Sequence, residues 1–403
     1  MTTQIIMLIL LVGLAIISAI LTKVFLERLG LPAIVGYIIL GFCIRLFDAE
    51  FNFLTERGEQ TIDFLAYIGL TVLLFRVGLE SKLHKLLKQF GKASVIGLTC
   101  IVISGVVGFS SAYWIIHLGL LTSLIIGIAL TATSVGMVAV IWQESGALKT
   151  NAGQLLLDMA ELNDIAGVVL MALIFTIAPI IISHGEQSLG KAILGTGVIF
   201  VAKLIFFCLL CILFALYLEK KLTSFLQRFE KPPEPTLIVV STGFMIASLA
   251  GFLGFSLAIG AFSAGLIFSR DPSSIKSQTA FEAIYDLFTP FFFIGIGLRI
   301  HLESLSSAFW PAGILILASV AGMFLGSTIP ALIYENWKLS TLLGLSMIPR
   351  AEVAMIIMER SKALKNDVMP DHIFTAMVIT CLTTCIIAPI ILTRAIPRWI
   401  KKK

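Results

Sequence analysis

The segment LLLDMAELNDIAGVVLMALIF, residues 155–175, decides the fold of this chain. It belongs to an apolar run over 152–183, and about 20 such residues in a helix cross a hydrocarbon core of ~30 Å. Its first half nevertheless carries Asp158, Glu161 and Asp164. An ionisable group inside a membrane helix costs ~2.5–3.5 kcal/mol and therefore calls for an explanation. The segment predicts a transmembrane helix that carries a functional charge.

The same excess of apolar residues extends over the whole chain. Of its 403 residues, 58% are hydrophobic and only 13% are charged, with a mean hydropathy of +1.02. Soluble domains carry about 25% charged residues, so the lipid bilayer is the solvent that fits this composition. Because lipid offers no hydrogen bonds to the backbone, each segment must satisfy its own polar groups, which favours helices. The composition predicts an all-α polytopic membrane protein.

We expect 13 transmembrane helices, because apolar runs of sufficient length recur from one end of the chain to the other. The predicted spans are about 4–22, 31–47, 62–80, 93–115, 119–142, 152–183, 191–217, 235–251, 253–270, 279–298, 306–333, 339–359 and 370–393. The first apolar stretch is too long for the core of a signal peptide, so we expect it to be retained.

The basic residues indicate how these spans are oriented. Counting alternate loops, one side of the membrane holds most of the lysine and arginine residues, including those in 82–92, in 220–231 and in the tail 394–403. Loops rich in these residues stay in the cytoplasm. With an odd number of spans, we expect a multi-pass protein of the inner cell membrane with its N-terminus outside and its C-terminus in the cytoplasm. The net charge of +5 therefore reflects orientation, and membrane lipid rather than nucleic acid is the expected partner.

The six cysteines all lie inside apolar segments. Cys208 and Cys211 have the spacing of a redox or metal pair, but their immediate surroundings contain no histidine or charged residue. We therefore expect neither disulfides nor a zinc site, and no resident cofactor.

Two pairs of similar segments suggest an internal repeat. The pairs are residues 30–41 with 254–265 and residues 138–141 with 353–356. With six spans on each side of span seven, the two halves would have opposite orientations, which is the plan of inverted-repeat transporters. We therefore expect inverted six-helix repeats at about 1–183 and 235–397, joined by a linker helix and the hydrophilic stretch 219–235. The alternative is that glycine-rich apolar helices resemble one another by chance.

Asp164 is the deepest ionisable group of span six, because an apolar run follows it directly. Burial in a low-dielectric medium favours the protonated form of a carboxyl group. Such a group can hold a proton or a small cation, one at a time, which is the minimum that cation/proton exchange requires. Glu161 lies three residues earlier on the same helix face. A structural carboxylate satisfied by a basic neighbour is the alternative for Asp164, and a stronger one for Glu161.

The stretch Thr131-Ala-Thr133-Ser134-Val-Gly136 predicts a break in span five. Three hydroxyl groups and a glycine in the middle of a membrane helix suit a local break, at which hydroxyl and carbonyl oxygens turn toward a cation. The alternative is that these hydroxyls bond to their own helix backbone.

A second break is predicted in span twelve, in Ile348-Pro349-Arg350-Ala351-Glu352. Proline removes a backbone donor and breaks the helix. We expect Arg350 to pair with Glu161 or Glu352 and to cap carbonyl groups that the break frees. A purely structural ion pair is the alternative for Glu352.

At these residues the chain resembles the monovalent cation/proton antiporter family, in its bacterial NapA-like and Kef-like branch. The resemblance covers essentially the whole chain, and the order and spacing of its motifs are specific when taken together. The matching stretches are 31–37, 73–80, 132–136, 163–164, 260–265, 290–295 and 349–353.

The resemblance implies a homodimer in which the whole chain, 1–403, is one antiporter domain with 13 helices. Spans four to six and eleven to thirteen would form a moving core in which the broken spans five and twelve cross, and the other spans would form the dimer scaffold. The core would move as an elevator. Asp164 matches the family's ion-binding aspartate, and Thr133 and Ser134 match the unwound segment beside it. Unlike in Kef-type systems, we expect no soluble regulatory domain after span thirteen.

Departures from the family pattern bear on the stoichiometry. Electrogenic members carry two adjacent aspartates, and here the first is Asn163. They also carry a lysine in span eleven, and here Ser319 takes that place. Both differences imply one-for-one, electroneutral exchange. Arg76, Ala351 and Glu161 also depart from the pattern, which leaves the pairing of the core charges open.

We therefore expect a secondary transporter, and not an enzyme, that exchanges Na⁺ for H⁺ around Asp164, with Asn163, Thr133 and Ser134 in the ion site. Residue types alone do not determine the preference among Na⁺, K⁺ and Li⁺, because it depends on the size and oxygen geometry of the site. The alternative is a K⁺/H⁺ efflux system of the same fold, gated by a separate cytoplasmic regulatory subunit. A cation channel is a more distant alternative, and an intramembrane aspartyl protease would need a second deep aspartate.

Overall fold

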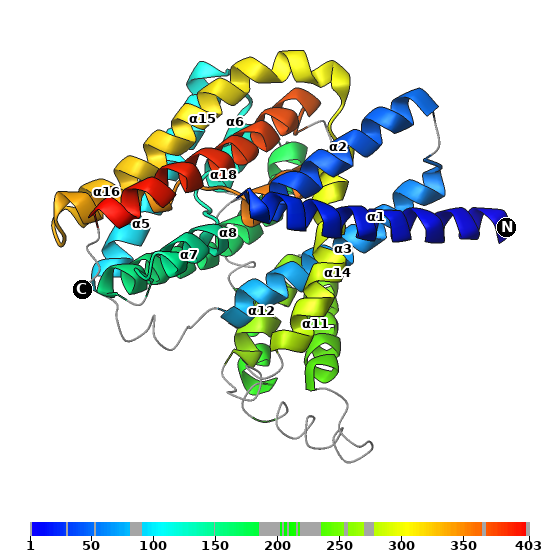
Figure 1. The fold of residues 1–403 in the computed structure, drawn as a ribbon, viewed down its shortest axis with the longest axis horizontal. Coiled ribbons are helices and arrows are strands. Elements are labelled where there is room, and N and C mark those ends of the chain that lie inside the picture. The colour runs from blue at the N-terminus through cyan, green and yellow to red at the C-terminus, as the bar shows by residue number, and fades with distance from the viewer. Residues whose placement is uncertain are drawn as a thin grey trace. The chain divides into compact units, whose positions relative to one another are not determined.

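The computed structural model describes residues 2–29, 31–51, 54–80, 91–148, 150–184, 202–203, 205–207, 209–214, 217, 235–253, 257–269, 278–364 and 368–399. Most of predicted span seven and of the linker 219–235 lies outside these residues, and so does Gly254 of the second repeat motif. The basic residues of the loop 81–90 are outside them as well. All regular secondary structure within the described ranges is helical (Figure 1).

The helices follow the apolar runs closely. They are α1 (Thr2–Arg28), α2 (Ala33–Phe51), α3 (Glu56–Glu80), α5 (Lys92–Ser110), the π-helix η1 (Ser111–Ile115), α6 (Leu120–Ala129), α7 (Val135–Glu144), α8 (Asn151–His184), α11 (Pro235–Phe252), α12 (Leu257–Phe268), α14 (Gln278–Leu298), α15 (Leu302–Ala331), α16 (Trp337–Ser346), α17 (Glu352–Lys362) and α18 (Asp371–Trp399). Each predicted span other than the seventh coincides with one of these helices or with a consecutive pair. Some helices run further than predicted because polar residues continue them; Glu56 and Glu59 form the first turn of α3, where negative charge is favourable.

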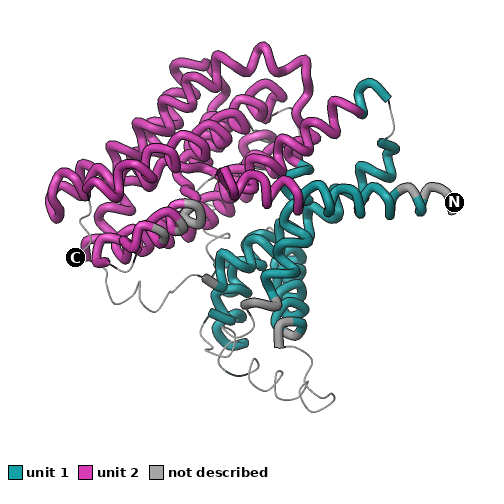
Figure 2. The backbone as a smooth tube through the Cα atoms, viewed as in Figure 1, with its two compact units in different colours: residues 1–19, 48–83, 183–295 teal, residues 20–47, 84–182, 296–403 magenta. Residues whose placement is uncertain are grey.

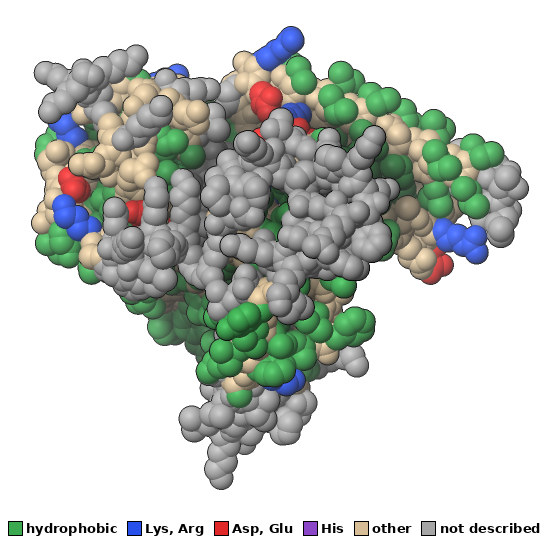
Figure 3. All heavy atoms as spheres, turned by 90° about the horizontal axis from the view of Figure 1, so that it is seen from below, with side chains coloured by type: hydrophobic (Ala, Val, Ile, Leu, Met, Phe, Trp, Pro, Cys, Tyr) green, Lys and Arg blue, Asp and Glu red, His purple; other side chains and the backbone are tan. Residues whose placement is uncertain are grey.

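The composition and surface of these helices are those of a membrane protein. Seven described helices are long and apolar enough to cross a membrane, and three further apolar helices are shorter. In α1, Ile9, Leu21 and Phe25 are 67, 65 and 63% exposed. Hydrophobic side chains also form broad patches on the face shown in Figure 3. Because apolar surface of this extent is unfavourable in water, the chain is a multi-pass membrane protein.

The chain divides into two compact units, which Figure 2 shows in different colours. Unit 1 consists of residues 1–19, 48–83 and 183–295, and unit 2 consists of residues 20–47, 84–182 and 296–403.

Within unit 1, α3 packs along α12, and α11 packs on α12. Glycines permit the first of these contacts. A Cβ atom on Gly78 would lie 2.1 Å from the backbone oxygen of Phe262, and one on Gly265 would lie 2.1 Å from that of Phe75. The ring of Phe75 packs against the ring of Phe281, with 5.5 Å between centroids.

Within unit 2, α15 packs along both α5 and α18. The contact with α5 is again made by glycines: a Cβ on Gly322 would lie 2.9 Å from Cα of Ser104, and one on Gly326 would lie 2.9 Å from Cα of Cys100. The order long helix, interrupted helix, long helix occurs twice in this unit, as α5, α6/α7, α8 and as α15, α16/α17, α18.

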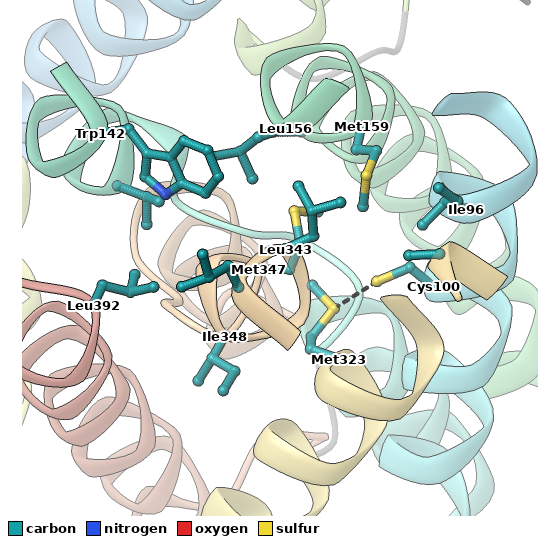
Figure 4. Close-up of a cluster of buried hydrophobic side chains, with 14 of the residues drawn as sticks. Ile96, Cys100, Trp142, Leu156, Met159, Met323, Leu343, Met347, Ile348 and Leu392 are labelled. Carbon is teal, nitrogen blue, oxygen red and sulfur yellow. Dashed lines mark hydrogen bonds between the residues drawn. The ribbon is translucent and has the colours of Figure 1, made fainter. Parts of the chain in front are cut away.

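The core of unit 2 is a buried apolar cluster to which α5, α7, α8, α15, α16 and α18 contribute (Figure 4). Trp142 of α7 and Met347, which follows α16, lie in this cluster and are fully buried. The indole Nε1 of Trp142 donates a hydrogen bond to Ser346 Oγ at 3.0 Å. The cluster thereby holds the two interrupted helices against each other.

Candidate ion-binding site

Two helices of unit 2 are interrupted where the sequence predicts breaks. The first break covers residues 130–134, between α6 and α7, and the second covers 347–351, between α16 and α17. In the second, Pro349 has no N–H group and disfavours helical conformation in the residue before it. In the first, Thr131 Oγ1 donates to the carbonyl of Ile128 at 2.8 Å, a local bond that competes with continuation of the helix.

The two breaks satisfy each other's backbone groups. The backbone N–H of Ser134 donates to the carbonyl of Pro349 at 2.8 Å. The hydroxyl of Thr133 lies 2.9 Å from the carbonyl oxygen of Met347 and 3.3 Å from that of Pro349. Lipid would leave these groups without partners. Each break is therefore stabilised by the other, and the two extended segments form one structure.

Arg350 occupies the second break and is fully buried. Its Nε donates to Ser319 Oγ on α15 at 3.0 Å, and its Nη1 donates to the carbonyl oxygen of Ala132 in the first break. Each break directly follows the C-terminal end of a half-helix, where partial negative charge favours a cation. The sequence predicts that Arg350 caps carbonyl groups freed by its own break; the carbonyl that its guanidinium contacts, that of Ala132, belongs to the first break. The pairing of Arg350 with Glu161 or Glu352 stays a prediction.

The backbone of Arg350 is held by α18. Its N–H donates to Thr384 Oγ1 at 3.3 Å, and the thiol of Cys385 donates to its carbonyl oxygen at 2.8 Å. The arginine is thus held at its backbone by α18 and at its guanidinium by α15 and the first break.

Helix α8 lies against the first break and the start of α17, close to Asp164 in the sequence. The fully buried Asn163 donates from Nδ2 to the carbonyl oxygen of Thr131 at 3.5 Å. One turn later, a Cβ on Gly167 would lie 3.3 Å from Val353 Cγ1 and 3.4 Å from Ala132 Cβ. The glycine therefore allows α8 to approach the first break and the start of α17 closely.

Two buried neutral oxygen atoms in this region receive no hydrogen bond. They are Ser134 Oγ and Asn163 Oδ1. Buried polar atoms in proteins are nearly always hydrogen-bonded, so this group calls for a missing partner. Asp164 has interactions with other groups, but Ser134 and Asn163 are almost completely buried, and their two neutral oxygens are suited to replace part of the water shell of a cation.

The structure brings together most of the residues that the sequence singles out. Thr133, Ser134, Asn163, Ser319 and Arg350 belong to one connected set around the breaks. Asp164 follows Asn163 directly on α8. Glu161 and Glu352 lie on α8 and at the first position of α17, and both are partly buried.

The groups that support this set could not be predicted from the sequence. The backbone carbonyl of Ala132 and the side chains of Cys100, Thr384 and Cys385 contact it through hydrogen bonds that depend on helix packing. Cysteines in apolar helices carry no local signal for such roles. The cysteines among the described residues form no disulfide with one another, while Cys208 of the Cys-x-x-Cys pair lies outside those residues.

Comparison with known proteins agrees with this arrangement. The model of a family described as "Sodium/hydrogen exchanger, transmembrane" matches residues 14–396. The probable Na⁺/H⁺ antiporter GerT of Bacillus cereus is 26% identical, over 87% of this chain and 89% of the relative. The K⁺/H⁺ antiporter subunit KhtU of Bacillus subtilis is also 26% identical, over 86% and 84%.

A solved structure shows the same fold. The sodium proton antiporter MjNhaP1 from Methanocaldococcus jannaschii aligns with a TM-score of 0.68 over 98% of this chain and 97% of that protein, at 16% identity. With the family model matching nearly the whole chain, the chain belongs to the transmembrane sodium/hydrogen exchanger family.

Proposed function

We propose that this chain exchanges a monovalent cation for a proton, one for one, at Asp164, and that Na⁺ is the favoured cation. The observation that carries this proposal is that two buried neutral oxygens, Ser134 Oγ and Asn163 Oδ1, receive no hydrogen bond, and Asn163 directly precedes Asp164 on α8. Ser134 and Asn163 supply neutral oxygens, and Asp164 supplies the carboxylate for which the cation and the proton compete. The relative GerT from Bacillus cereus is named as a probable Na⁺/H⁺ antiporter, which supports the proposed class of transport.

Electroneutral exchange follows from the charges around the aspartate. With a cation bound, the carboxylate and the ion together are neutral, and the protonated carboxyl is neutral as well. Asn163 and Ser319 add no charge. The guanidinium of Arg350 bonds to Ser319 Oγ and to the carbonyl of Ala132, and neither contact involves the carboxylate of Asp164. The membrane potential would then act equally on the two directions of the cycle.

We further propose that unit 2 contains the moving core of an elevator-type transporter. It holds predicted spans four to six and eleven to thirteen, together with most of α2. The twofold occurrence of long helix, interrupted helix and long helix supports inverted repeats within a subunit of 13 spans. The crossed breaks would carry the ion site with them as the core moves.

The proposed membrane is the inner cell membrane, with the C-terminus in the cytoplasm and two copies forming a homodimer. Near its start α15 carries Trp310, which is 73% exposed, and Trp337 just beyond its end is 59% exposed. Such aromatic residues mark the two interfaces of a bilayer. At the Trp337 end Lys92 pairs with Glu335 at 3.3 Å, and Lys338 lies over the ring of Trp337. These lysines support the assignment of this end to the cytoplasm.

A K⁺/H⁺ antiporter gated by a separate cytoplasmic subunit is the second candidate. The relative KhtU is named as a subunit of a K⁺/H⁺ antiporter, and its identity to this chain equals that of GerT. The oxygen ligands proposed here are compatible with both ions, so the choice between them is made by experiment.

The test uses the full chain in proteoliposomes. Imposed Na⁺ or K⁺ gradients should move protons, and Asp164→Asn should abolish this movement because the amide carries neither charge nor a titrating proton. Asp371→Asn is the matched control: its carboxylate is 48% exposed and pairs with Lys362, so exchange should persist.

Three outcomes would overturn parts of this proposal. Flux that survives in folded Asp164→Asn protein excludes the aspartate as the exchange site. A rate that responds to an imposed membrane potential excludes electroneutral exchange. Cation current without proton movement indicates a channel.

A further inference from the structure

A buried set of sulfur and hydroxyl groups contacts the amide of Asn163 from α5 and α15. Cys100 Sγ accepts a hydrogen bond from Asn163 Nδ2 at 3.8 Å and another from Ser327 Oγ at 3.1 Å. The Cys100 thiol in turn donates to Met323 Sδ at 3.1 Å (Figure 4). Cys100, Ser327 and Met323 are all fully buried. None of them takes part in the proposed exchange directly.

The donors and acceptors around the Asn163 amide determine which of its two terminal positions holds the nitrogen and which holds the oxygen. An asparagine amide can be placed with its oxygen and nitrogen exchanged. A backbone carbonyl and a thioether sulfur are acceptors only, and a thiol has a single proton. Because that proton goes to Met323 Sδ, Cys100 Sγ offers only lone pairs to the amide. The carbonyl oxygen of Thr131, 3.5 Å from Asn163 Nδ2, is likewise only an acceptor and needs an N–H donor from the amide.

Both neighbours therefore require the NH₂ group of Asn163, and the amide oxygen takes the remaining side, where a Cβ on Gly97 of α5 would lie 3.7 Å from it. This agrees with the observation that Asn163 Oδ1 is buried and accepts no hydrogen bond. The support is close and rigid, because Gly326 lets α15 approach the backbone of Cys100. Small movements of the amide are restricted on the side where Cys100 lies.

We propose that Cys100 is a positioning residue for cation binding. Held by Ser327 and Met323, it orients the amide of Asn163 so that Oδ1 is presented to the transported ion. This inference rests on the proposed function, in which Asn163 supplies an ion ligand. Without the thiol, the amide can rotate, and a correctly placed oxygen is then available for only part of the time. The apparent affinity for the cation should fall, while the maximal rate depends on Asp164 and should change little.

The experiment measures the concentration dependence of exchange in proteoliposomes for the full chain and its variants. Removing one such hydrogen-bonding partner should raise KM for Na⁺ or K⁺ by about three- to tenfold in Cys100→Ala, with Vmax within about twofold of wild type. Cys100→Ser keeps an acceptor at the same place and should restore most of the affinity. Met323→Leu keeps the volume but frees the thiol proton to turn toward the amide oxygen, so KM should rise here too.

Two serine-to-alanine variants at the contact between α5 and α15 form a matched pair, of which one tests the role of Cys100 and the other is the control. Ser327→Ala removes the donor to Cys100 and should raise KM. Ser104→Ala removes a buried hydroxyl that bonds only to the carbonyl of Ile101 on its own helix, so KM should stay at the wild-type value. The cation-dependent rise in melting temperature should shrink in Cys100→Ala and Ser327→Ala and persist in Ser104→Ala.

The results separate this inference from the proposed function. If the wild-type chain exchanges cations but KM is unchanged in Cys100→Ala, or rises equally in Ser104→Ala, the positioning role is wrong and the ion site stands. If the wild-type chain shows no exchange, the proposed function itself fails. Should Cys100→Ala not fold, Met323→Leu and Ser327→Ala decide the question, and an unchanged KM in both overturns the inference.

Discussion

The guanidinium of Arg350 donates from Nε to Ser319 Oγ at 3.0 Å, and both residues are completely buried. The family resemblance of the sequence implies that Ser319 takes the place of a lysine found in electrogenic members. The short serine leaves space for the arginine of the second break. A positive charge therefore still lies beside Ser319, but it belongs to Arg350 in the second break. Hydrogen bonds to Ser319 on α15 and to Ala132 in the first break hold the guanidinium in place.

Ser319→Ala should destabilise the protein, because it removes an acceptor from a buried charged group. We expect a loss of about 1.5–3 kcal/mol in the free energy of unfolding, seen as a lower melting temperature in detergent. Ser104→Ala, another buried hydroxyl deletion on the facing helix, should have a much smaller effect. Equal losses of unfolding free energy in the two variants would show that the hydrogen bond to Arg350 contributes no more to stability than that of Ser104.

Asn163→Asp should make stability depend on pH. The amide donates to the carbonyl of Thr131, whereas an ionised carboxylate can only accept and would face that oxygen without a proton between them. A protonated carboxyl can donate again. Relative to wild type, the melting temperature of the variant should therefore be low at high pH and recover as the pH falls. A difference that does not vary with pH would contradict this.

Thr133→Val should weaken the contact between the two breaks. It keeps the shape of the side chain but removes the hydroxyl that bonds to the carbonyls of Met347 and Pro349. We expect a loss of about 1–3 kcal/mol, because two buried carbonyls lose a partner, together with slower exchange. Thr131→Val is the matched control, since its hydroxyl bonds only to Ile128 of the preceding helix. Chemical denaturation measures the loss of unfolding free energy, and proton flux measures the exchange rate. A larger loss of unfolding free energy in Thr131→Val than in Thr133→Val would contradict the hydrogen bonds between the two breaks.

Gly78→Ala should disrupt unit 1. The new Cβ would lie 2.1 Å from the backbone oxygen of Phe262, so α3 and α12 would have to separate. We expect a loss of about 3 kcal/mol or more, visible as a lower melting temperature or poor yield of folded protein. Gly13→Ala in α1 has nothing within 4 Å of its new Cβ and should be neutral or slightly stabilising, because alanine favours helices. Normal stability of Gly78→Ala would show that these helices are further apart.

The apparent affinity for the cation should fall as the pH falls. A proton and a cation compete for the carboxylate of Asp164, so binding of the cation requires the deprotonated form. In the range where this group is mostly protonated, KM should rise by up to about tenfold per pH unit, while Vmax at saturating cation changes little. Initial rates of exchange at several pH values measure this. A KM that stays constant while Vmax changes would argue against competition at a single site.

Within the described residues, the sequence by itself was sufficient to locate the helices and both breaks. Hydropathy marks the spans because every apolar run long enough to cross lipid must be helical there. Pro349 and the hydroxyl cluster around Thr133 act through their own backbone, so their effect is also local. The position of Asp164 between a polar and an apolar half of α8 could be read in the same way, as could the absence of a neighbouring acid at Asn163.

Only the tertiary structure decided how these residues are joined. That Ser134 binds Pro349, that Arg350 reaches Ser319 and Ala132, and that Cys100 lies against Asn163 depends on contacts between residues far apart in the chain. In a membrane the hydrophobic pattern shows which residues face away from water, and it does not distinguish lipid from another helix. Close packing at small residues such as Gly326 and Gly167 and the pairing of buried donors with acceptors select the partners, and both are properties of the folded chain.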